Sequence, residues 1–210
     1  MFPKTPLAEW QHILIDTSVL VDYFSDATRY EKNPLVKRRI ELSQKVLNAL
    51  AEIELPEGKK RCIYISSITI GELRKLPQSD NVNLLVETLI EHDVIFVDYT
   101  KRIATDLLYN LEKYLPLGQK FQFVAHLEKV LKIDGVASAR QWIEDDMKIV
   151  ACAKSIKKLD VVLTSDARTF LPIAEAMEVP CITMNEDNFQ KDIFGNLDFT
   201  GISQTKRKKR

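Results

Sequence analysis

Three acidic residues stand at or just beyond the ends of apolar segments that have the composition of β-strands. Asp16 directly follows His12–Ile15, and Asp166 comes soon after Val161–Leu163. Glu72 lies early in a helical segment that Ser66 or Ser67 would cap, after the strand-like run Cys62–Ile65. Parallel strands end at a common sheet edge, so these three carboxylates are expected on the same edge. Taken singly, Asp16 and Asp166 also suit a helix N-cap, and Glu72 suits a solvated helix surface.

A fourth acid comes from a helix predicted over Gln141–Leu159. At about 100° per residue, several apolar side chains fall within roughly 60° of Asp146 on the helical wheel, which places it near the centre of the apolar face. These side chains are Trp142, Ile143, Ile149, Val150 and Ala153. Asp145 lies about 100° away, at a margin that water is expected to reach. A carboxylate in a buried stripe costs several kcal/mol unless a cation or a hydrogen-bond donor meets it.

Acids gathered in this way repel one another unless a cation lies among them. The chain offers no cluster of histidines or cysteines, and its Cys62, Cys152 and Cys181 form no CxxC pair. Ligation by oxygen atoms alone favours Mg²⁺ or Mn²⁺, one or two ions, over zinc. The three widely spaced cysteines also argue against a disulfide framework and indicate a reducing compartment.

The elements that must position these acids alternate between strand and helix. Solidly apolar strands separated by helical periodicity predict an α/β protein, with a parallel sheet of about five strands covered on both faces. The predicted strands are His12–Ile15, Cys62–Ile65, Val94–Val97, Val161–Leu163 and Cys181–Met184. We expect one domain over residues 10–185, with extra helical material at about 101–134 and a basic flexible tail at 199–210.

Length and composition limit the classes of protein that remain. The chain has 210 residues, 45% hydrophobic and 29% charged, which excludes collagen-like and largely disordered proteins. No apolar run approaches the roughly 18 residues of a membrane helix, so we expect a cytoplasmic protein without a membrane partner. The formal net charge is +0, so any attraction for a nucleic acid must be local.

Four strings of the sequence resemble a known family. ILIDTSVLVDYF at the first strand, ISSITIGEL around Glu72, EDDMKIVACA around Asp146 and VLTSDARTF around Asp166 are similar to PIN-domain ribonucleases of the kind found in VapC-type toxins. The resemblance spans Ile13–Phe170 and implies a three-layer α/β/α fold, metal-dependent hydrolysis of RNA phosphodiesters, and an antitoxin-like partner. Known toxins of this group are usually shorter than this chain.

The resemblance also implies roles for individual residues. Asp16, Glu72, Asp146 and Asp166 match the four metal-binding and catalytic acids, with Asp146 preferred to its neighbour. Ser18 resembles a hydroxyl that supports a carboxylate or a metal-bound water, although a helix cap is an equal alternative. Asp145 is a second supporting candidate. The metal would lower the pKa of a bound water, so a side-chain general base is not required.

Substrate and partner contacts are less sharply indicated. Arg168 and Arg74, each two residues beyond a predicted metal ligand, are the candidate RNA phosphate contacts. The apolar helix at Leu35–Leu55 is a candidate homodimer face. A phosphatase with an Asp after its first strand would need a second acid where Ser18 stands. The remaining alternative is a PIN fold that binds RNA or protein without catalysis.

Overall fold

The computed structural model describes residues 3, 5–73, 87, 89, 91, 94–114, 119–133, 139–191 and 197–199. The structural statements that follow refer to these residues.

A five-stranded parallel sheet forms the centre of the molecule. Its strands are β1 (His12–Ile15), β2 (Cys62–Ser66), β3 (Ile95–Val97), β4 (Val161–Thr164) and β5 (Cys181–Thr183). Their order across the sheet is β3-β2-β1-β4-β5, and every pairing is parallel. Ile13 on the central strand pairs with Ile63 on one side and with Val161 on the other. The predicted α/β fold with a parallel sheet of about five strands is confirmed.

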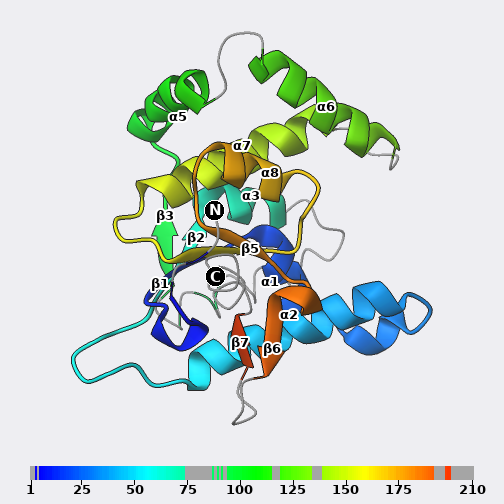
Figure 1. Cartoon of the computed structure of the whole chain (residues 1–210), viewed down its shortest axis with the longest axis vertical. Coiled ribbons are helices and arrows are strands. Elements are labelled where there is room, and N and C mark those ends of the chain that lie inside the picture. Colours follow the sequence, from blue (N-terminus) through cyan, green and yellow to red (C-terminus); the bar gives the residue numbers. More distant parts are fainter. Residues whose placement is uncertain are drawn as a thin grey trace, which may run out of the picture.

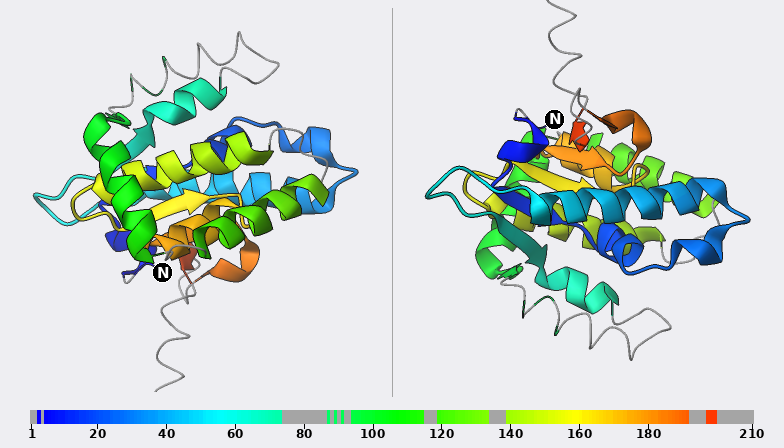
Figure 2. Two further views of the ribbon diagram at one scale, coloured as in Figure 1. Left: turned by 90° about the horizontal axis from the view of Figure 1, so that it is seen from above. Right: turned by 90° about the horizontal axis from the view of Figure 1, so that it is seen from below.

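Helices cover both faces of this sheet (Figures 1 and 2). On one face lie α1 (Thr17–Tyr23) and α2 (Pro34–Glu52), and on the other lie α5 (Lys101–Tyr114), α6 (Gln119–Ile133), α7 (Ala139–Ser155) and α8 (Phe170–Ala176). Because strand side chains alternate between faces, β1 supplies Ile13 and Ile15 to one core and Leu14 to the other. The α5 and α6 helices occupy the segment for which extra helical material was expected.

Helix α2 shows how the local sequence sets the ends of an element. Asn33 caps it, its side chain accepting a hydrogen bond from the Val36 amide, and Pro34 occupies the first turn, where a missing N–H costs nothing. The buried residues Ile40, Val46 and Leu50 then recur at helical spacing against the sheet.

The chain beyond the sheet contains a small antiparallel hairpin that the sequence did not reveal. Its strands are β6 (Phe189–Lys191) and β7 (Leu197–Phe199). Buried Phe189 joins the core that also contains Leu7 and Trp10. Phe199, expected at the start of the basic tail, is the last residue of β7, and the rest of that tail lies outside the described residues. Among the described helices, none is long and apolar enough to cross a membrane.

Candidate functional site

Two of the predicted acids stand where the strand order reverses. The chain builds the sheet outward from β1 to β3 and then returns to place β4 on the other side of β1. The crevice beyond the carboxyl ends of strands at such a reversal is the usual binding place in open α/β sheets. Asp16 follows β1 and Asp166 comes two residues after the end of β4. The Asp16 amide also donates to the Leu163 carbonyl at 3.0 Å, which extends the β1–β4 pairing to the site.

Asp16 is buried at this edge, with only 3% of its surface exposed. It caps α1, since its carboxylate accepts from the Ser18 amide, so the helix-cap reading of this residue also holds. The hydroxyls of Ser18 and Thr164 donate to the same oxygen, Thr164 from 2.8 Å. Burial nevertheless raises the pKa of Asp16 to about 6, with a smaller contribution from the negative charge of Asp166.

Asp146 reaches the same edge from α7, which crosses the opposite face of the sheet. Thr169 connects it to Asp166: the threonine Oγ1 lies 2.7 Å from Asp146 Oδ2 and 2.6 Å from Asp166 Oδ2. The backbone amides of Arg168 and Thr169 donate to the other Asp166 oxygen, at 2.7 and 3.2 Å. Asp146 and Asp166, 20 residues apart along the chain, therefore meet through one hydroxyl.

That hydroxyl has a single proton and faces two carboxyl oxygens. Thr169 can donate to only one of them at a time, so the other contact needs a proton on the carboxyl group. Burial, followed by the negative charges of Asp16, Asp166 and Glu72, raises the pKa of Asp146 well above its ordinary value. A proton on one of these two carboxyl groups would remove one of the like charges that crowd the site.

Glu72 completes the set from α3 (Ser67–Leu73). The Thr17 hydroxyl, one residue after Asp16, donates to Glu72 Oε2, and Thr17 Oγ1 also lies 3.1 Å from Thr69 Oγ1. The four acids predicted from separate parts of the chain are therefore close enough for Asp16, Glu72 and Asp166 each to act on the pKa of Asp146.

The donor set is suited by its chemistry to a hard divalent cation. It consists of carboxylates with neighbouring hydroxyls, which are the oxygen ligands that Mg²⁺ and Mn²⁺ prefer. Over the described part of the chain, however, no group of three or more acidic, histidine or cysteine side chains is already positioned to hold a metal ion. The hydroxyls of Thr17, Thr164 and Thr169 instead bind the carboxyl oxygens.

The two supporting candidates behave differently. Ser18 is central: its Oγ donates to Asp16 and accepts from the Ser165 amide at 2.8 Å, so it joins α1 to the loop after β4. Asp145 was expected at a wet margin, and that expectation is wrong, since only 6% of it is exposed. Its Oδ1 accepts from Gln141 Nε2 at 3.0 Å and from Lys148 Nζ at 2.8 Å.

The helical wheel also overestimated the burial of two residues on the apolar face of α7. Asp146 is only half-buried, and Trp142, expected in the core, is 48% exposed. The wheel gives the direction of a side chain, but not which flank of the helix a neighbouring element covers. Ala139 and Ile143, in the N-terminal turns of α7, are 2% and 1% exposed, so the core reaches these turns and leaves the flank of Trp142 open.

The two candidate phosphate contacts have different outcomes. Arg168 is at the site: its side chain is 52% exposed, and its Nε lies 4.0 Å from Asp166 Oδ1. Arg74 lies outside the described residues.

Several residues of the site were not singled out from the sequence. Thr17, Thr164 and Thr169 hold the carboxyl groups, and the only signal for them was the hydroxyl-rich character of the strings around Asp16 and Asp166.

An ion pair between α1 and α2 was also not anticipated from the sequence. Arg39 of α2 donates to both oxygens of buried Asp22, at 2.8 Å each, and Ser165 Oγ donates to Asp22 at 2.5 Å.

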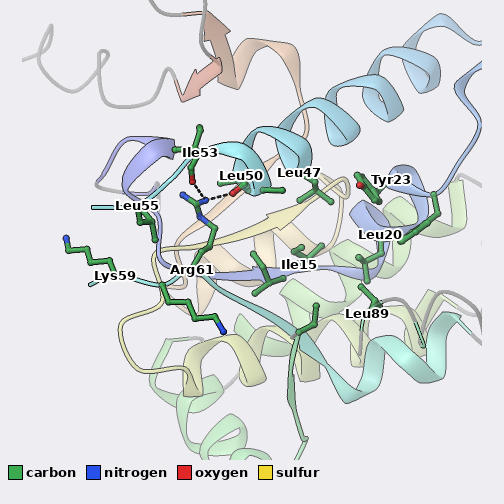
Figure 3. Close-up of a pocket in the computed structure, with 15 residues that line it drawn as sticks. Ile15, Leu20, Tyr23, Leu47, Leu50, Ile53, Leu55, Lys59, Arg61 and Leu89 are labelled. Atoms are coloured by element: carbon green, nitrogen blue, oxygen red, sulfur yellow. Dashed lines mark hydrogen bonds between the residues drawn. The ribbon is translucent and has the colours of Figure 1, made fainter. Parts of the chain in front are cut away.

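Two cavities lie near these elements. One of about 310 Å³ has Arg38, Arg39, Ser165 and Ala167 in its wall, the last two being the sequence neighbours of Asp166. A second, of about 570 Å³, is mostly apolar and contains none of the four acids in its wall (Figure 3). Arg61 closes part of that wall by donating to the carbonyls of Leu50 and Ile53.

Comparison with known proteins gives structural neighbours only. No family model matches the sequence, and no curated protein matches it. Among solved structures, the chain is similar to one in VapBC2 from Rickettsia felis bound to a DNA fragment from their promoter, with a TM-score of 0.41 and 13% identity, over 82% of this chain and 98% of that one. It is also similar to one in DNA-bound VapBC from Salmonella typhimurium, with a TM-score of 0.37 and 18% identity, over 83% of this chain and 99% of that one.

Proposed function

We propose that this chain is a Mg²⁺- or Mn²⁺-dependent endoribonuclease with a PIN-like active site at Asp16, Glu72, Asp146 and Asp166. The observation that carries the proposal is the gathering of acids around Asp146, which meets Asp166 through the Thr169 hydroxyl. Burial, followed by the charges of the other three acids, raises the pKa of Asp146. Crowding of this kind destabilises a fold, and a bound divalent cation would offset that cost.

The roles of the residues follow from their positions. The four carboxylates would hold the ion, with Asp16 at the reversal point between β1 and β4. When bound, such an ion supplies a hydroxide near neutral pH and neutralises charge on the phosphate. Ser18 and Thr164 keep the Asp16 carboxylate in place, and Thr169 does the same for Asp146 and Asp166. Arg168 beside Asp166, and Arg38 in the wall of the 310 Å³ cavity, would contact RNA phosphates.

The test is cleavage of single-stranded RNA by the purified protein in Mg²⁺, in Mn²⁺ and in chelator. We expect metal-dependent cleavage that Asp146→Asn lowers at least about 100-fold, with unfolding stability unchanged or slightly raised because a like charge is removed. The control is Glu144→Gln, since Glu144 lies two residues away and is 47% exposed beside Arg140. Cleavage that persists in chelator, or an Asp146→Asn variant with full activity, would contradict the proposal.

The second candidate is a PIN-like scaffold that binds RNA or protein without catalysis. It is favoured by the hydroxyl-bonded state of the carboxyl groups, which does not present a ready set of three ligands in the described residues. Calorimetric titration with Mn²⁺ separates the two candidates, because a scaffold without a metal site gives no heat that depends on Asp16 or Asp146.

We further propose an antitoxin-like protein as the partner and a cytoplasmic, toxin-type role. The proposal is supported by the resemblance of the four strings to VapC-type toxins and by the three free cysteines, which suit a reducing compartment. The test is co-expression with the product of an adjacent small reading frame. We expect the two proteins to purify together and the RNA cleavage to be lost.

A further inference from the structure

Trp142 has an exposure that its position on α7 does not lead one to expect. It lies about 40° from Asp146 on the helical wheel, on the opposite flank of Asp146 from Ile143 and Val150. Both of those side chains are buried, to 1% and 0% exposed, whereas Trp142 is 48% exposed. Position along the axis does not explain the difference, because Ala139, one turn before Ile143, is only 2% exposed.

One turn after Trp142 on α7 stands Asp146, which the Thr169 hydroxyl joins to Asp166. Side chains four residues apart on a helix are neighbours, so the Trp142 indole and the Asp146 carboxyl share one surface. An exposed indole in this position adds little to the stability of the core.

The features around it are those of a single-stranded nucleic acid surface. The Arg168 side chain, 52% exposed, lies 4.0 Å from Asp166, which Thr169 joins to Asp146. An exposed aromatic side chain and an exposed guanidinium beside the acids match a base, a scissile phosphate and a neighbouring phosphate. An indole face also suits any of the four bases, because each offers a flat ring.

We propose that Trp142 is a base-stacking platform, which receives an unpaired nucleobase next to the phosphate held at the acid cluster. The inference rests on the proposed nuclease function for its substrate, and it names the substrate class as unpaired RNA. A paired base, being stacked within its own helix, would not reach the indole.

The chain offers a direct optical test. Its two tryptophans differ sharply: Trp10 is 0% exposed, whereas Trp142 is open to solvent. Titration with single-stranded oligouridylate, with Ca²⁺ in place of Mg²⁺, should quench the fluorescence of the wild-type protein. In Trp142→Phe the remaining emission comes from Trp10, and the quench should disappear while affinity stays within about threefold, since phenylalanine also stacks.

Trp142→Ala should weaken oligouridylate binding about tenfold and raise the KM for cleavage by a similar factor, with kcat little changed. Tyr109→Ala is the matched control, because Tyr109 is an exposed aromatic residue on a different helix and should leave both quantities unchanged. A base-free polyphosphate should bind Trp142→Ala and the wild type equally.

The outcomes separate this inference from the proposed function. Quenching by oligouridylate together with weaker binding of Trp142→Ala supports the stacking platform, even if the wild-type protein cleaves no RNA. Metal-dependent cleavage with an unchanged KM in Trp142→Ala would overturn the platform and leave the nuclease intact. Equal binding of oligouridylate by wild type and Trp142→Ala would overturn it as well.

Discussion

Hydroxyl side chains control the state of the acids at this site. Ser18 and Thr164 bind one oxygen of Asp16, while Thr169 lies between Asp146 and Asp166. Each hydroxyl lowers the energy of a carboxylate that burial and like charge disfavour. A divalent cation would replace this partial compensation with a full charge, so the hydroxyls are expected to matter most for how readily the site ionises.

Replacing Thr169 with valine tests this role at the level of one residue. The Thr169 hydroxyl lowers the pKa of Asp146, so its loss should raise that pKa further and shift the acidic limb of the cleavage pH profile to higher pH. The concentration of Mg²⁺ needed for half-maximal cleavage should also rise, about tenfold. Thr169→Ser, which keeps the hydroxyl, should follow the wild type. An unshifted profile in Thr169→Val would show that the bridge is only structural.

At the scale of elements, the loop that carries Asp166 is held from α1 and α2. Asp22 near the end of α1 accepts from two guanidinium nitrogens of Arg39 on α2 and from the Ser165 hydroxyl, one residue before Asp166. Asp22 is 2% exposed, so these bonds replace contacts with water, and the pair fixes the loop as well as the packing of the two helices.

Arg39→Met should therefore destabilise the protein by about 2 kcal/mol, because it leaves a buried carboxylate without its cation. This value is below that of a fully buried pair, since the Arg39 side chain is 39% exposed. Adding Asp22→Asn should restore much of the loss. Urea unfolding of the two single variants and the double variant measures the coupling, and additive effects would contradict it.

The elements themselves were largely predictable from local pattern. Strand β1 was predicted over its observed range, His12–Ile15, and the other strands of the sheet to within about a residue at each end, because apolar β-branched runs identify buried parallel strands. The hairpin of β6 and β7 was not predicted, since its three-residue strands mix apolar and polar residues, unlike the apolar β3 and β5, and are too short for an alternation to be recognised.

Prediction was less successful where one element covers another. The wheel placed Asp146 on the sheet-facing side correctly, but it exchanged the exposure of Asp145 and Trp142. Asp145 is buried and accepts hydrogen bonds from Gln141 and Lys148 of its own helix, whereas Trp142 is exposed although its neighbour Ile143 is buried. Periodicity contains no information on either point. The threonine contacts join residues far apart in sequence, or depend on loop geometry, and were missed for the same reason.

At the scale of the whole molecule, the site makes the stability of the protein depend on pH. The pKa of Asp16 is about 6 in the folded protein and 3.8 as an ordinary aspartate, so the folded state holds an extra proton between these values. Stability therefore falls as pH rises through this window, and the full cost of the buried charge is present above pH 6. In chelator, we expect the free energy of unfolding to fall by about 2 kcal/mol between pH 4 and pH 7 from Asp16, and further from Asp146.

Asp16→Asn should remove much of this fall, because the amide does not titrate while it can still cap α1. Asp26→Asn is the control: the pKa of Asp26 is lowered by its bonds with Thr28, which is the opposite sign, and its side chain is exposed. A saturating divalent ion should raise the stability of the wild type more at pH 7 than at pH 4, since the ion binds the ionised carboxylates. Chemical unfolding at several pH values, with Mg²⁺ and with chelator, measures both effects. A stability that rises between pH 4 and pH 7 in chelator, or one that Mg²⁺ changes equally at both pH values, would be incompatible with four acids crowded around a single cation site.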